Sequence, residues 1–358
     1  MLKAAIVGAT GVVGQQFIVA LQNHPWFEIA GLAASERSAG KRYGNAIKDE
    51  KSGAMLWFCD STPGLDVLEQ EVLLGDSLDA SKYDIIFSSL ESESSRRLDA
   101  KYAKTTPVVT TAAAFRYDDD VPIIIPGVND DHLGLLEYQK KKRGWQGFIS
   151  PQPNCTTTGM VMTLKPILDD FGIKIVIMTS MQAVSGAGRS PGVLALDVTD
   201  NVIPYIPKEE EKVEIETKKI LGKLNANSII PAEFRVSCTC TRVNVREGHT
   251  EAVFAETARK AEPDDIMKSM KKYSKKFGDR GFPSAPKELI TISEDPFRPQ
   301  PRLDRDNEGG MTTTVGRIRK DAAFDNGIKY VLVSHNTKMG AAKGAVLTAE
   351  ILEKSEML

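Results

Sequence analysis

The first strand of this chain runs directly into a turn built around three glycines. The segment Leu2–Val7 is apolar, and Gly8, Gly11 and Gly14 follow it in the spacing Gly-x-x-Gly-x-x-Gly. Glycine lets the backbone approach a phosphate group closely, and a helix that begins at such a turn presents free N–H groups to it. Because Val12–Leu21 continues with helical spacing, the turn predicts a dinucleotide-binding fold. A tight turn without a ligand is the alternative.

Short apolar strands and helical patterns alternate through the first third of the chain. This alternation is typical of a parallel βαβ sheet. The expected strands are Leu2–Val7, Ile29–Ala34, Tyr83–Phe87, Val108–Thr110 and Ile123–Ile125, and the expected helices are Val12–Leu21, Ser94–Ala103 and Asp130–Lys142.

The second half of the chain has longer strands and fewer helices, which indicates an α+β domain with a large mixed sheet. The expected strands are Ile173–Ala183, Arg235–Asn244, Glu251–Thr257, Met311–Arg317 and Lys329–Ser334. The fold class is therefore α/β, with a Rossmann-type parallel-sheet domain followed by an α+β domain. We expect the first domain to span residues 1–153 and the second 154–337, with the C-terminal helix 338–358 returning to the first.

Length, charge and cysteine content exclude several classes of protein. A chain of 358 residues exceeds what one hydrophobic core usually organises, so two domains are expected. The formal net charge of −2 gives no electrostatic reason to expect nucleic acid or an anionic membrane as a partner. The 4 cysteines make no disulfide framework in so long a chain. These features favour a soluble cytoplasmic protein.

The turn after the second strand indicates which dinucleotide is bound. NAD enzymes usually place an acidic residue there for the ribose 2′-hydroxyl. This chain instead has Ser35, Arg37, Ser38 and Lys41 around the turn, and these side chains suit the 2′-phosphate of NADP. Glu36 opposes this interpretation, because it could hold a 2′-hydroxyl if the turn were rotated by one position, so dual NAD and NADP use stays open.

Cys155 lies in the run Asn-Cys-Thr-Thr-Thr-Gly, just before the helical pattern Met160–Phe171. A helix N-terminus lowers the pKa of a thiol and supplies N–H groups for an oxyanion hole. We therefore expect a reactive thiolate here. The alternative is a buried structural cysteine, although the flanking residues are polar and turn-forming.

A cysteine nucleophile needs a group that moves a proton. Of the 4 histidines, His249 lies in a polar connection between two long strands, where catalytic groups concentrate. His335 ends a strand near the expected cofactor, while His24 is expected in a loop and His132 on a surface helix. Cys238 and Cys240 share one face of a strand and lack further metal ligands nearby, so they predict core packing and no metal site.

With these features in place, the chain resembles aspartate-semialdehyde dehydrogenases, most closely the archaeal and fungal branch. The resemblance runs from about Lys3 to Glu350. The motifs that carry it are Gly8 to Gly14, Ser35 to Lys41, Phe115-Arg116 before Asp120-Val121-Pro122, Pro153-Asn154-Cys155, Gln182 to Gly188, Glu209 to Lys212, and Arg242 seven residues before His249.

The resemblance implies NADPH-dependent reduction of β-aspartyl phosphate to aspartate semialdehyde through a thioester, with release of phosphate. It implies that Cys155 is the nucleophile, His249 the general acid–base and Gln182 a residue that positions the acyl-enzyme. The implied substrate-binding residues are Arg116, Asn154, Glu209, Lys212 and Arg242. The implied cofactor-binding residues are Gly8, Thr10, Gly11, Val12, Val13, Ser35, Arg37, Ser38, Ser88, Ser185, Gly186 and Asn336. It also implies homodimers or homotetramers built through the sheet of the second domain.

Several of these residues have plainer interpretations. The charged run Glu209 to Lys212 is typical of a solvated helix face, and Glu210 or Glu211 could take the place of Glu209. Arg116 could form a surface ion pair with the acidic residues that follow it, and Gln182 could satisfy a strand edge. Competing functions are a malonyl-coenzyme A reductase, an N-acetylglutamyl-phosphate reductase and a catalytically silent NADPH-binding regulator.

Overall fold

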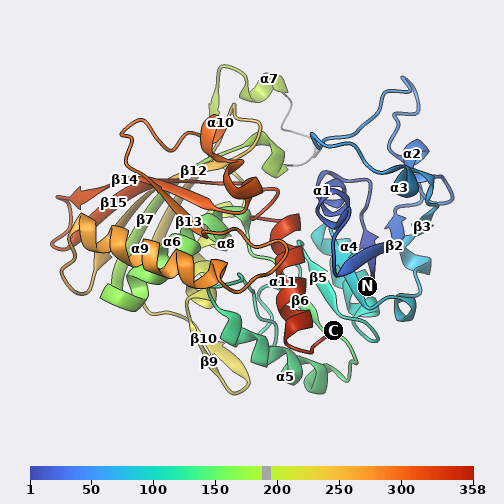
Figure 1. Cartoon of the computed structure of the whole chain (residues 1–358), viewed down its shortest axis with the longest axis horizontal. Coiled ribbons are helices and arrows are strands. Elements are labelled where there is room, and N and C mark those ends of the chain that lie inside the picture. The colour runs from blue at the N-terminus through green and yellow to red at the C-terminus, as the bar shows by residue number, and fades with distance from the viewer. Residues whose placement is uncertain (188–194) are drawn as a thin grey trace.

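The computed structural model describes residues 1–187 and 195–358, so Gly188 of the Gln182 to Gly188 motif lies outside the described residues. The two large sheets lie side by side, the N-terminal one on the right of Figure 1 and the other on the left. The C-terminal helix α11, Ala342–Lys354, packs against α1, Val12–Leu21, and thus returns to the N-terminal part of the chain.

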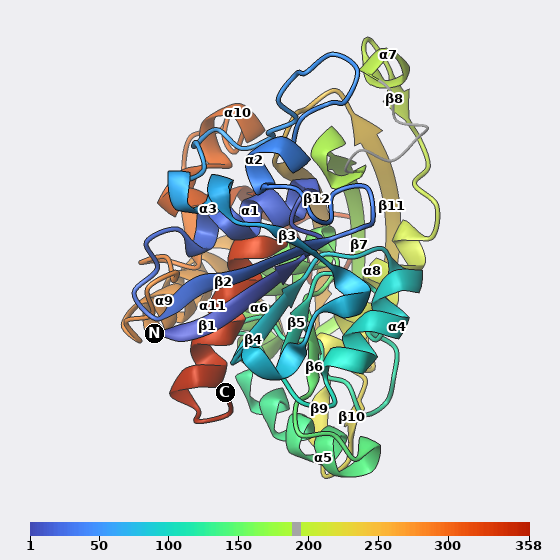
Figure 2. The same ribbon diagram turned by 90° about the vertical axis from the view of Figure 1, so that its right-hand side faces the viewer.

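The first sheet has six parallel strands in the order β3-β2-β1-β4-β5-β6. Its strands are β1 Leu2–Val7, β2 Phe27–Ala34, β3 Val72–Leu74, β4 Ile85–Ser88, β5 Val108–Thr110 and β6 Ile149–Pro151. In a parallel sheet the carboxyl ends of all strands lie at the same edge. The glycine turn after β1, Ser88 at the end of β4 and Cys155 after β6 are therefore placed along one edge of the sheet, whose strands β1, β4, β5 and β6 can be followed in Figure 2.

The expected strand Ile123–Ile125 is wrong. This apolar run lies between Pro122 and Pro126, and its backbone bonds to the side chain of Asn129 instead of to a neighbouring strand. Proline removes a ladder donor, so a β-branched run between two prolines is poorly suited to a sheet. β6 forms the edge of the sheet in its place, followed directly by the cysteine segment.

The second sheet is mixed and has seven strands in the order β13-β14-β15-β12-β7-β11-β8. Its strands are β7 Ile173–Gln182, β8 Val202–Ile203, β11 Arg235–Val243, β12 His249–Thr257, β13 Ile290–Ser293, β14 Thr313–Asp321 and β15 Gly327–Ser334. β7 and β11 run parallel, whereas β12 is antiparallel to both β7 and β15. The predicted fold class, a parallel sheet followed by a large mixed sheet, is confirmed.

Three helices position the centre of the second half. The helix α6, Cys155–Phe171, and the helix α9, Pro263–Gly278, cover one face of the mixed sheet (Figure 1). The helix α8, Glu209–Ile220, lies along β11, which the short edge strand β8 pairs only at Arg242 and Val243. Here Glu210 and Glu214 accept hydrogen bonds from the backbone N–H groups of Cys240 and Cys238. Thus α8 occupies the place of a further strand along that part of β11.

The remaining elements are short or connect the two sheets. They are α2 Tyr43–Ala46, α3 Leu65–Glu69, α4 Ser92–Tyr102, α5 Gly134–Arg143, α7 Ala195–Val198, α10 Pro301–Asp304, the hairpin strands β9 Lys223–Asn225 and β10 Ser228–Ile230, and the 3-10 turns η1 Gly75–Ser77, η2 Ala80–Lys82, η3 Asp130–Leu133, η4 Val184–Ala187 and η5 Asn307–Gly310. Within the described parts of the chain, no helix is long and apolar enough to cross a membrane.

Candidate active site

Cys155 is the first residue of α6, five positions earlier than the helical pattern from Met160 predicts. Asn154 caps the helix: its side-chain oxygen accepts from the N–H groups of Thr156 at 2.9 Å and Thr157 at 3.2 Å. An N-cap asparagine satisfies helix N–H groups that otherwise lack a partner. The cap explains how a run of β-branched threonines can begin a helix.

The thiol of Cys155 faces the ring of His249, and the Sγ–Nε2 distance is 3.1 Å. The expected loop position of His249 is wrong, because it is the first residue of β12 and is fully buried. Its backbone pairs with Ser334 of β15. A position on a paired strand holds the ring more rigidly than a loop would, and the pair has the geometry of a nucleophile and its proton-transfer partner.

The second ring nitrogen of His249 determines where the proton of the neutral ring lies. Nδ1 accepts a hydrogen bond from the backbone N–H of Ala183 at 3.1 Å. A nitrogen that accepts cannot also carry the proton, so the proton lies on Nε2 and points towards the sulfur. Burial lowers the pKa of His249 to about 3, with smaller contributions from Arg242 and His335, so the ring is neutral near pH 7.

The expectation of a lowered thiol pKa is wrong for this state of the protein. Burial and the neighbouring Glu209 carboxylate raise the pKa of Cys155 to about 12, although Arg242, Arg116 and the N–H of Thr156 act in the opposite direction. The helix start contributes little because Asn154 already occupies two of its N–H groups. For the same reason these two N–H groups are not available as an oxyanion hole.

Glu209 is the acidic residue that lies beside the cysteine. It is buried, and its Oε1 accepts from the side-chain amide of Asn154 at 2.7 Å, while Lys212 Nζ lies 3.4 Å from its Oε2. Glu210 points to the edge of β11 and Glu211 is exposed. The solvated-face interpretation is therefore wrong for Glu209, and the helix brings this glutamate of the three to the site.

Arg242 approaches the same centre from β11, beside Gln182 in the strand register. Its Nη1 donates to the carbonyl oxygen of Ala183 at 2.8 Å. Gly186 lies directly against it, since a Cβ at this position would be 3.0 Å from Arg242 Nη1 and 3.2 Å from His249 Cε1. A side chain here would therefore require one of these groups to shift by a few tenths of an ångström.

Arg116 is buried and does not form the expected surface pair with the acidic residues after it. Its Nη1 donates to Glu216 Oε1 at 3.0 Å. Asp118 and Asp120 pair with Arg143 instead. Glu216 is missing from the predicted site, although its spacing of seven residues from Glu209 on α8 places both on one helix face.

The side chain of Gln182 is buried and donates to the hydroxyl of Ser180 at 3.2 Å. Among the hydrogen bonds between described residues, none joins Gln182 to Cys155. Its positioning role stays a prediction.

The turn after β1 leaves its helix start open. Gly8 has φ +82°, and a Cβ on Gly14 would lie 2.2 Å from the carbonyl oxygen of Gly8, so both positions require glycine. The N-cap residue of α1 is Gly11, which has no side chain to accept from the N–H groups of Val12 and Val13. Such N–H groups have no partner within the helix and form a ready anion site. The turn therefore fits a pyrophosphate.

The turn after β2 places its predicted residues in two environments. Ser35 and Arg37 are exposed, whereas Ser38 is buried with a hydroxyl that has no hydrogen-bond partner among the residues that the structure describes. Lys41 forms an ion pair with Glu50 at 2.9 Å. An exposed arginine beside an unpartnered hydroxyl is a donor set that suits a phosphate group.

A short bridge joins the cysteine centre to the region of the glycine turn. Asn336 donates to Ser185 Oγ at 2.8 Å and accepts from the N–H of Gly248 at 2.9 Å. The next residue, Thr337, accepts a hydrogen bond through its hydroxyl from the side-chain amide of Gln16 of α1 at 3.3 Å. Ser185 and Asn336 thus lie between the start of α1 and the cysteine–histidine pair.

The other histidines and cysteines have structural partners. His24 lies in a loop, as expected, but is buried and pairs with Glu350 at 2.9 Å. His132 is buried between Asn129 and Gly222, so its expected surface position is wrong. Cys238 and Cys240 are buried in the core. No group of side chains that could hold a metal ion occurs among the described residues.

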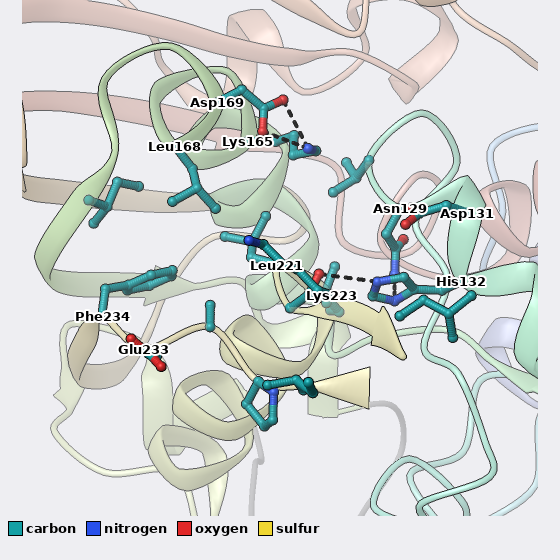
Figure 3. Close-up of a pocket in the computed structure, with 18 residues that line it drawn as sticks. Asn129, Asp131, His132, Lys165, Leu168, Asp169, Leu221, Lys223, Glu233 and Phe234 are labelled. Carbon is teal, nitrogen blue, oxygen red and sulfur yellow. Dashed lines mark hydrogen bonds and ion pairs between the residues drawn. The ribbon is translucent and has the colours of Figure 1, made fainter. Parts of the chain in front are cut away.

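A separate cavity of about 750 Å³ lies at the opposite ends of α6 and α8 (Figure 3). Lys165 and Asp169, which pair with each other along the helix, come from the last turns of α6, and Leu221 follows α8. None of the predicted site residues lines this cavity.

The parallel sheet with an open glycine turn and the buried cysteine–histidine pair together define the class of protein: a dinucleotide-dependent dehydrogenase with a cysteine at its centre. The family patterns described as "Semialdehyde dehydrogenase, NAD binding domain" and "Semialdehyde dehydrogenase, dimerisation domain" match residues 3–136 and 164–339.

Curated relatives cover almost the entire chain. Aspartate-semialdehyde dehydrogenase from Methanothermobacter thermautotrophicus is 44% identical over 354 residues, 99% of each chain. The Candida albicans enzyme is 40% identical over 373 residues, again 99% of each. Its crystal structure with NADP has a TM-score of 0.90 at 37% identity and covers 100% of both chains. The chain belongs to the aspartate-semialdehyde dehydrogenase family, which confirms the resemblance.

Proposed function

We propose that this chain catalyses the NADPH-dependent reductive dephosphorylation of L-aspartyl 4-phosphate to L-aspartate 4-semialdehyde. The observation that carries the proposal is the 3.1 Å contact between Cys155 and His249 inside a ring of Glu209, Arg242 and Arg116. The relatives named aspartate-semialdehyde dehydrogenase at 40–44% identity support the same substrate.

The charges around the pair complement that substrate. Arg242 offers a planar fork to the α-carboxylate, and Glu209 offers a carboxylate oxygen to the α-ammonium. Arg116 and Lys212 would balance the phosphate, while Asn154 would orient the substrate beside the sulfur. One carboxylate and three cations match one ammonium group and several anionic oxygens.

We propose that Cys155 Sγ attacks the acyl carbon and forms a thioester as the bond to phosphate breaks, and that the thiol proton leaves with the phosphate. Gln182 would hold the acyl group in place. NADPH, when bound, supplies the hydride that reduces the thioester to the aldehyde. The Nε2–H of His249 would donate a hydrogen bond to the carbonyl oxygen as charge develops there. As the aldehyde forms, the departing sulfur would take this proton, and Nε2 would regain one from solvent, which is the one proton that the overall reaction consumes.

The cofactor would be held at the open start of α1 by Gly8, Thr10, Gly11, Val12 and Val13. The 2′-phosphate would lie near Ser35, Arg37 and Ser38, and Ser88, Ser185, Gly186 and Asn336 would lie along the path to the cysteine. We assign residues 1–153 with the C-terminal helix 338–358 to cofactor binding, and 154–337 to catalysis and dimerisation.

We propose a homodimer, or a tetramer of paired dimers, in the cytoplasm. The face of the mixed sheet opposite α6 and α9 carries exposed Ile177 on β7 and Thr239 on β11. Association through that face would cover an apolar side chain that a monomer leaves in water.

The test measures NADPH formation from aspartate semialdehyde, phosphate and NADP, and compares it with NADPH oxidation by malonyl-coenzyme A. We expect activity with the semialdehyde and none with the coenzyme A ester, which has no ammonium group for Glu209. Activity with the ester alone would make the chain a malonyl-coenzyme A reductase. No activity with either would favour the silent regulator.

A further inference from the structure

Glu216 lies two helical turns after Glu209 on α8, and its carboxylate is completely buried. Oε2 accepts from the backbone N–H of Asn154 at 2.6 Å. Oε1 accepts from Arg116 Nη1 at 3.0 Å and from the hydroxyl of Tyr117 at 3.2 Å. One carboxylate therefore bonds both to the residue before the cysteine and to the arginine assigned to phosphate.

Each of these bonds fixes a different part of the centre. The bond to Asn154 holds the cap of α6, so it fixes where the helix and the Cys155 sulfur begin. The Arg116 guanidinium has further bonds from Nε to the carbonyl oxygen of Gln152 and from Nη2 to that of Thr111. Three acceptors on different segments fix the plane of the guanidinium, and only Glu216 among them carries a charge.

The charge and the shape of this side chain are both needed. A buried arginine without a counterion is strongly unfavourable, and a carboxylate with two oxygens can accept from two separate donors. A glutamine at position 216 has a single oxygen, so its amide nitrogen would face either Arg116 or the N–H of Asn154, and both are donors.

We infer that Glu216 is a positioning residue, which holds the Arg116 guanidinium and the start of α6 in a fixed relation so that phosphate lies opposite the sulfur. The inference rests on the proposed function, because it takes the phosphate site to be at Arg116. Glu216 itself would not contact substrate.

The first experiment compares Glu216→Gln with the wild type in two assays. In the semialdehyde assay, the KM for phosphate should rise about tenfold, since a hydrogen bond to a charged group is lost, and by a larger factor than kcat falls. In the absence of NADP, phosphate should slow alkylation of Cys155 by iodoacetamide in the wild type and protect the variant much less.

Glu214→Gln is the matched control. Glu214 lies on the same helix, and its carboxylate also accepts from a backbone N–H, that of Cys238 at 3.1 Å, but it faces β11 and not Arg116. A Glu216→Gln variant whose phosphate KM and phosphate protection equal those of Glu214→Gln would overturn the inference.

A double-mutant cycle separates positioning from a general loss of structure. In an Arg116→Ala background, Glu216→Gln should raise the phosphate KM by less than twofold, because the group it orients is gone. Equal factors in both backgrounds would show that Glu216 does not act through Arg116.

If Glu216→Gln does not fold, Glu216→Asp replaces it as the test variant. It keeps the charge but is shorter by one methylene, so it cannot reach both donors, and the phosphate KM should again rise; an unchanged KM contradicts the inference. A wild type without activity on aspartate semialdehyde would refute the proposed function. If the wild type is active but Glu216→Gln leaves the phosphate KM and the phosphate protection unchanged, this inference is refuted and the proposed function is not.

Discussion

Two helices in this chain begin directly after strands of the same parallel sheet, and they use their first N–H groups in opposite ways. At the start of α1, Gly11 has no side chain, so the N–H groups of Val12 and Val13 receive no cap from it. At the start of α6, the side chain of Asn154 takes the corresponding N–H groups of Thr156 and Thr157. The open start suits an anion that comes from outside, whereas the closed start holds a neutral thiol in place.

The difference shows that a strand, a turn and a helix do not by themselves predict an anion site. The N-cap residue decides whether the helix potential is available to a ligand or is used within the protein. At α6 the cap takes up N–H groups that would otherwise lower the pKa of the Cys155 thiol, which burial and Glu209 raise.

The largest expected effect is a loss of catalysis at the start of α6 that leaves cofactor binding at the start of α1 unchanged. Cys155→Ser should lower the rate of aldehyde oxidation on the order of 10⁴-fold, because a hydroxyl beside a neutral imidazole is a much weaker nucleophile. Binding of NADP, measured by fluorescence titration, should stay within about twofold since α1 is untouched. Retention of most of the activity would refute the thioester mechanism.

The next largest effect is expected when a side chain is introduced that caps the start of α1. Gly11 has φ −77° and ψ 167°, and a Cβ there would meet only the carbonyl oxygen of Gly8 at 3.4 Å, so Gly11→Asp should fold. Its carboxylate should cap α1 and repel the pyrophosphate. We expect the Kd for NADP to rise about tenfold or more while stability changes by a few tenths of a kcal/mol.

Gly11→Ala is the control for that variant, because it adds a Cβ without a cap. An equal rise in Kd for the alanine variant would attribute the effect to steric hindrance and contradict the role of the free N–H groups.

A smaller effect is expected when the closed start is opened. Asn154→Ala removes the cap of α6 and should cost about 1 kcal/mol of stability in urea unfolding. The freed N–H groups of Thr156 and Thr157 should then lower the pKa of the Cys155 thiol, measured from the pH dependence of alkylation. Thr158→Val removes a different bond of the same turn, from its hydroxyl to the carbonyl oxygen of Asn154, and should leave that pKa near the wild-type value. A thiol pKa that stays equal or rises in Asn154→Ala would contradict the comparison.

The smallest effect concerns the support beneath α6. Glu251 is fully buried below Gly159, and within the described part of the chain neither of its carboxylate oxygens has a hydrogen-bond partner. Burial raises the pKa of this carboxyl well above its ordinary value. The folded protein keeps a proton that the unfolded chain loses above its lower pKa, so stability from this group falls as pH rises.

The free energy of unfolding of Glu251→Gln, relative to that of the wild type, should therefore be higher at pH 8 than at pH 5. Urea unfolding of both proteins at the two pH values would measure this difference. Glu256→Gln, at the end of the same strand where Glu256 pairs with Lys174, should give no comparable difference. A variant less stable than the wild type at pH 8 would show that the carboxylate is charged in the folded state.

Local patterns predicted most of the fold. The glycine turn, the alternation of strands and helices around it and the helix over Val12–Leu21 follow from spacing that nearby residues determine. The error at Ile123–Ile125 came from reading β-branched residues without weighing the prolines on each side. The early start of α6 was hidden because threonines favour helices weakly, and the cap by Asn154 compensates for them.

The site was predicted less completely because several of its relations depend on tertiary packing. Nothing near His249 in sequence indicates that the N–H of Ala183 fixes its proton, or that the ring is on a strand. Glu216 becomes relevant only when α8 packs beside the segment before Cys155. The thiol pKa was predicted in the wrong direction, since burial is a property of the folded chain and the helix effect a local one.

The glutamates that line the edge of β11 have a consequence for the behaviour of the protein in concentrated solution. An uncovered strand edge is a template on which the strand of another chain can grow, and this growth leads to aggregates. The N–H groups of Cys238 and Cys240 are occupied by Glu214 and Glu210. Chain-to-chain growth along this stretch would first have to detach α8, and with it Glu209 and Glu216, so resistance to aggregation and an intact catalytic centre depend on the same helix.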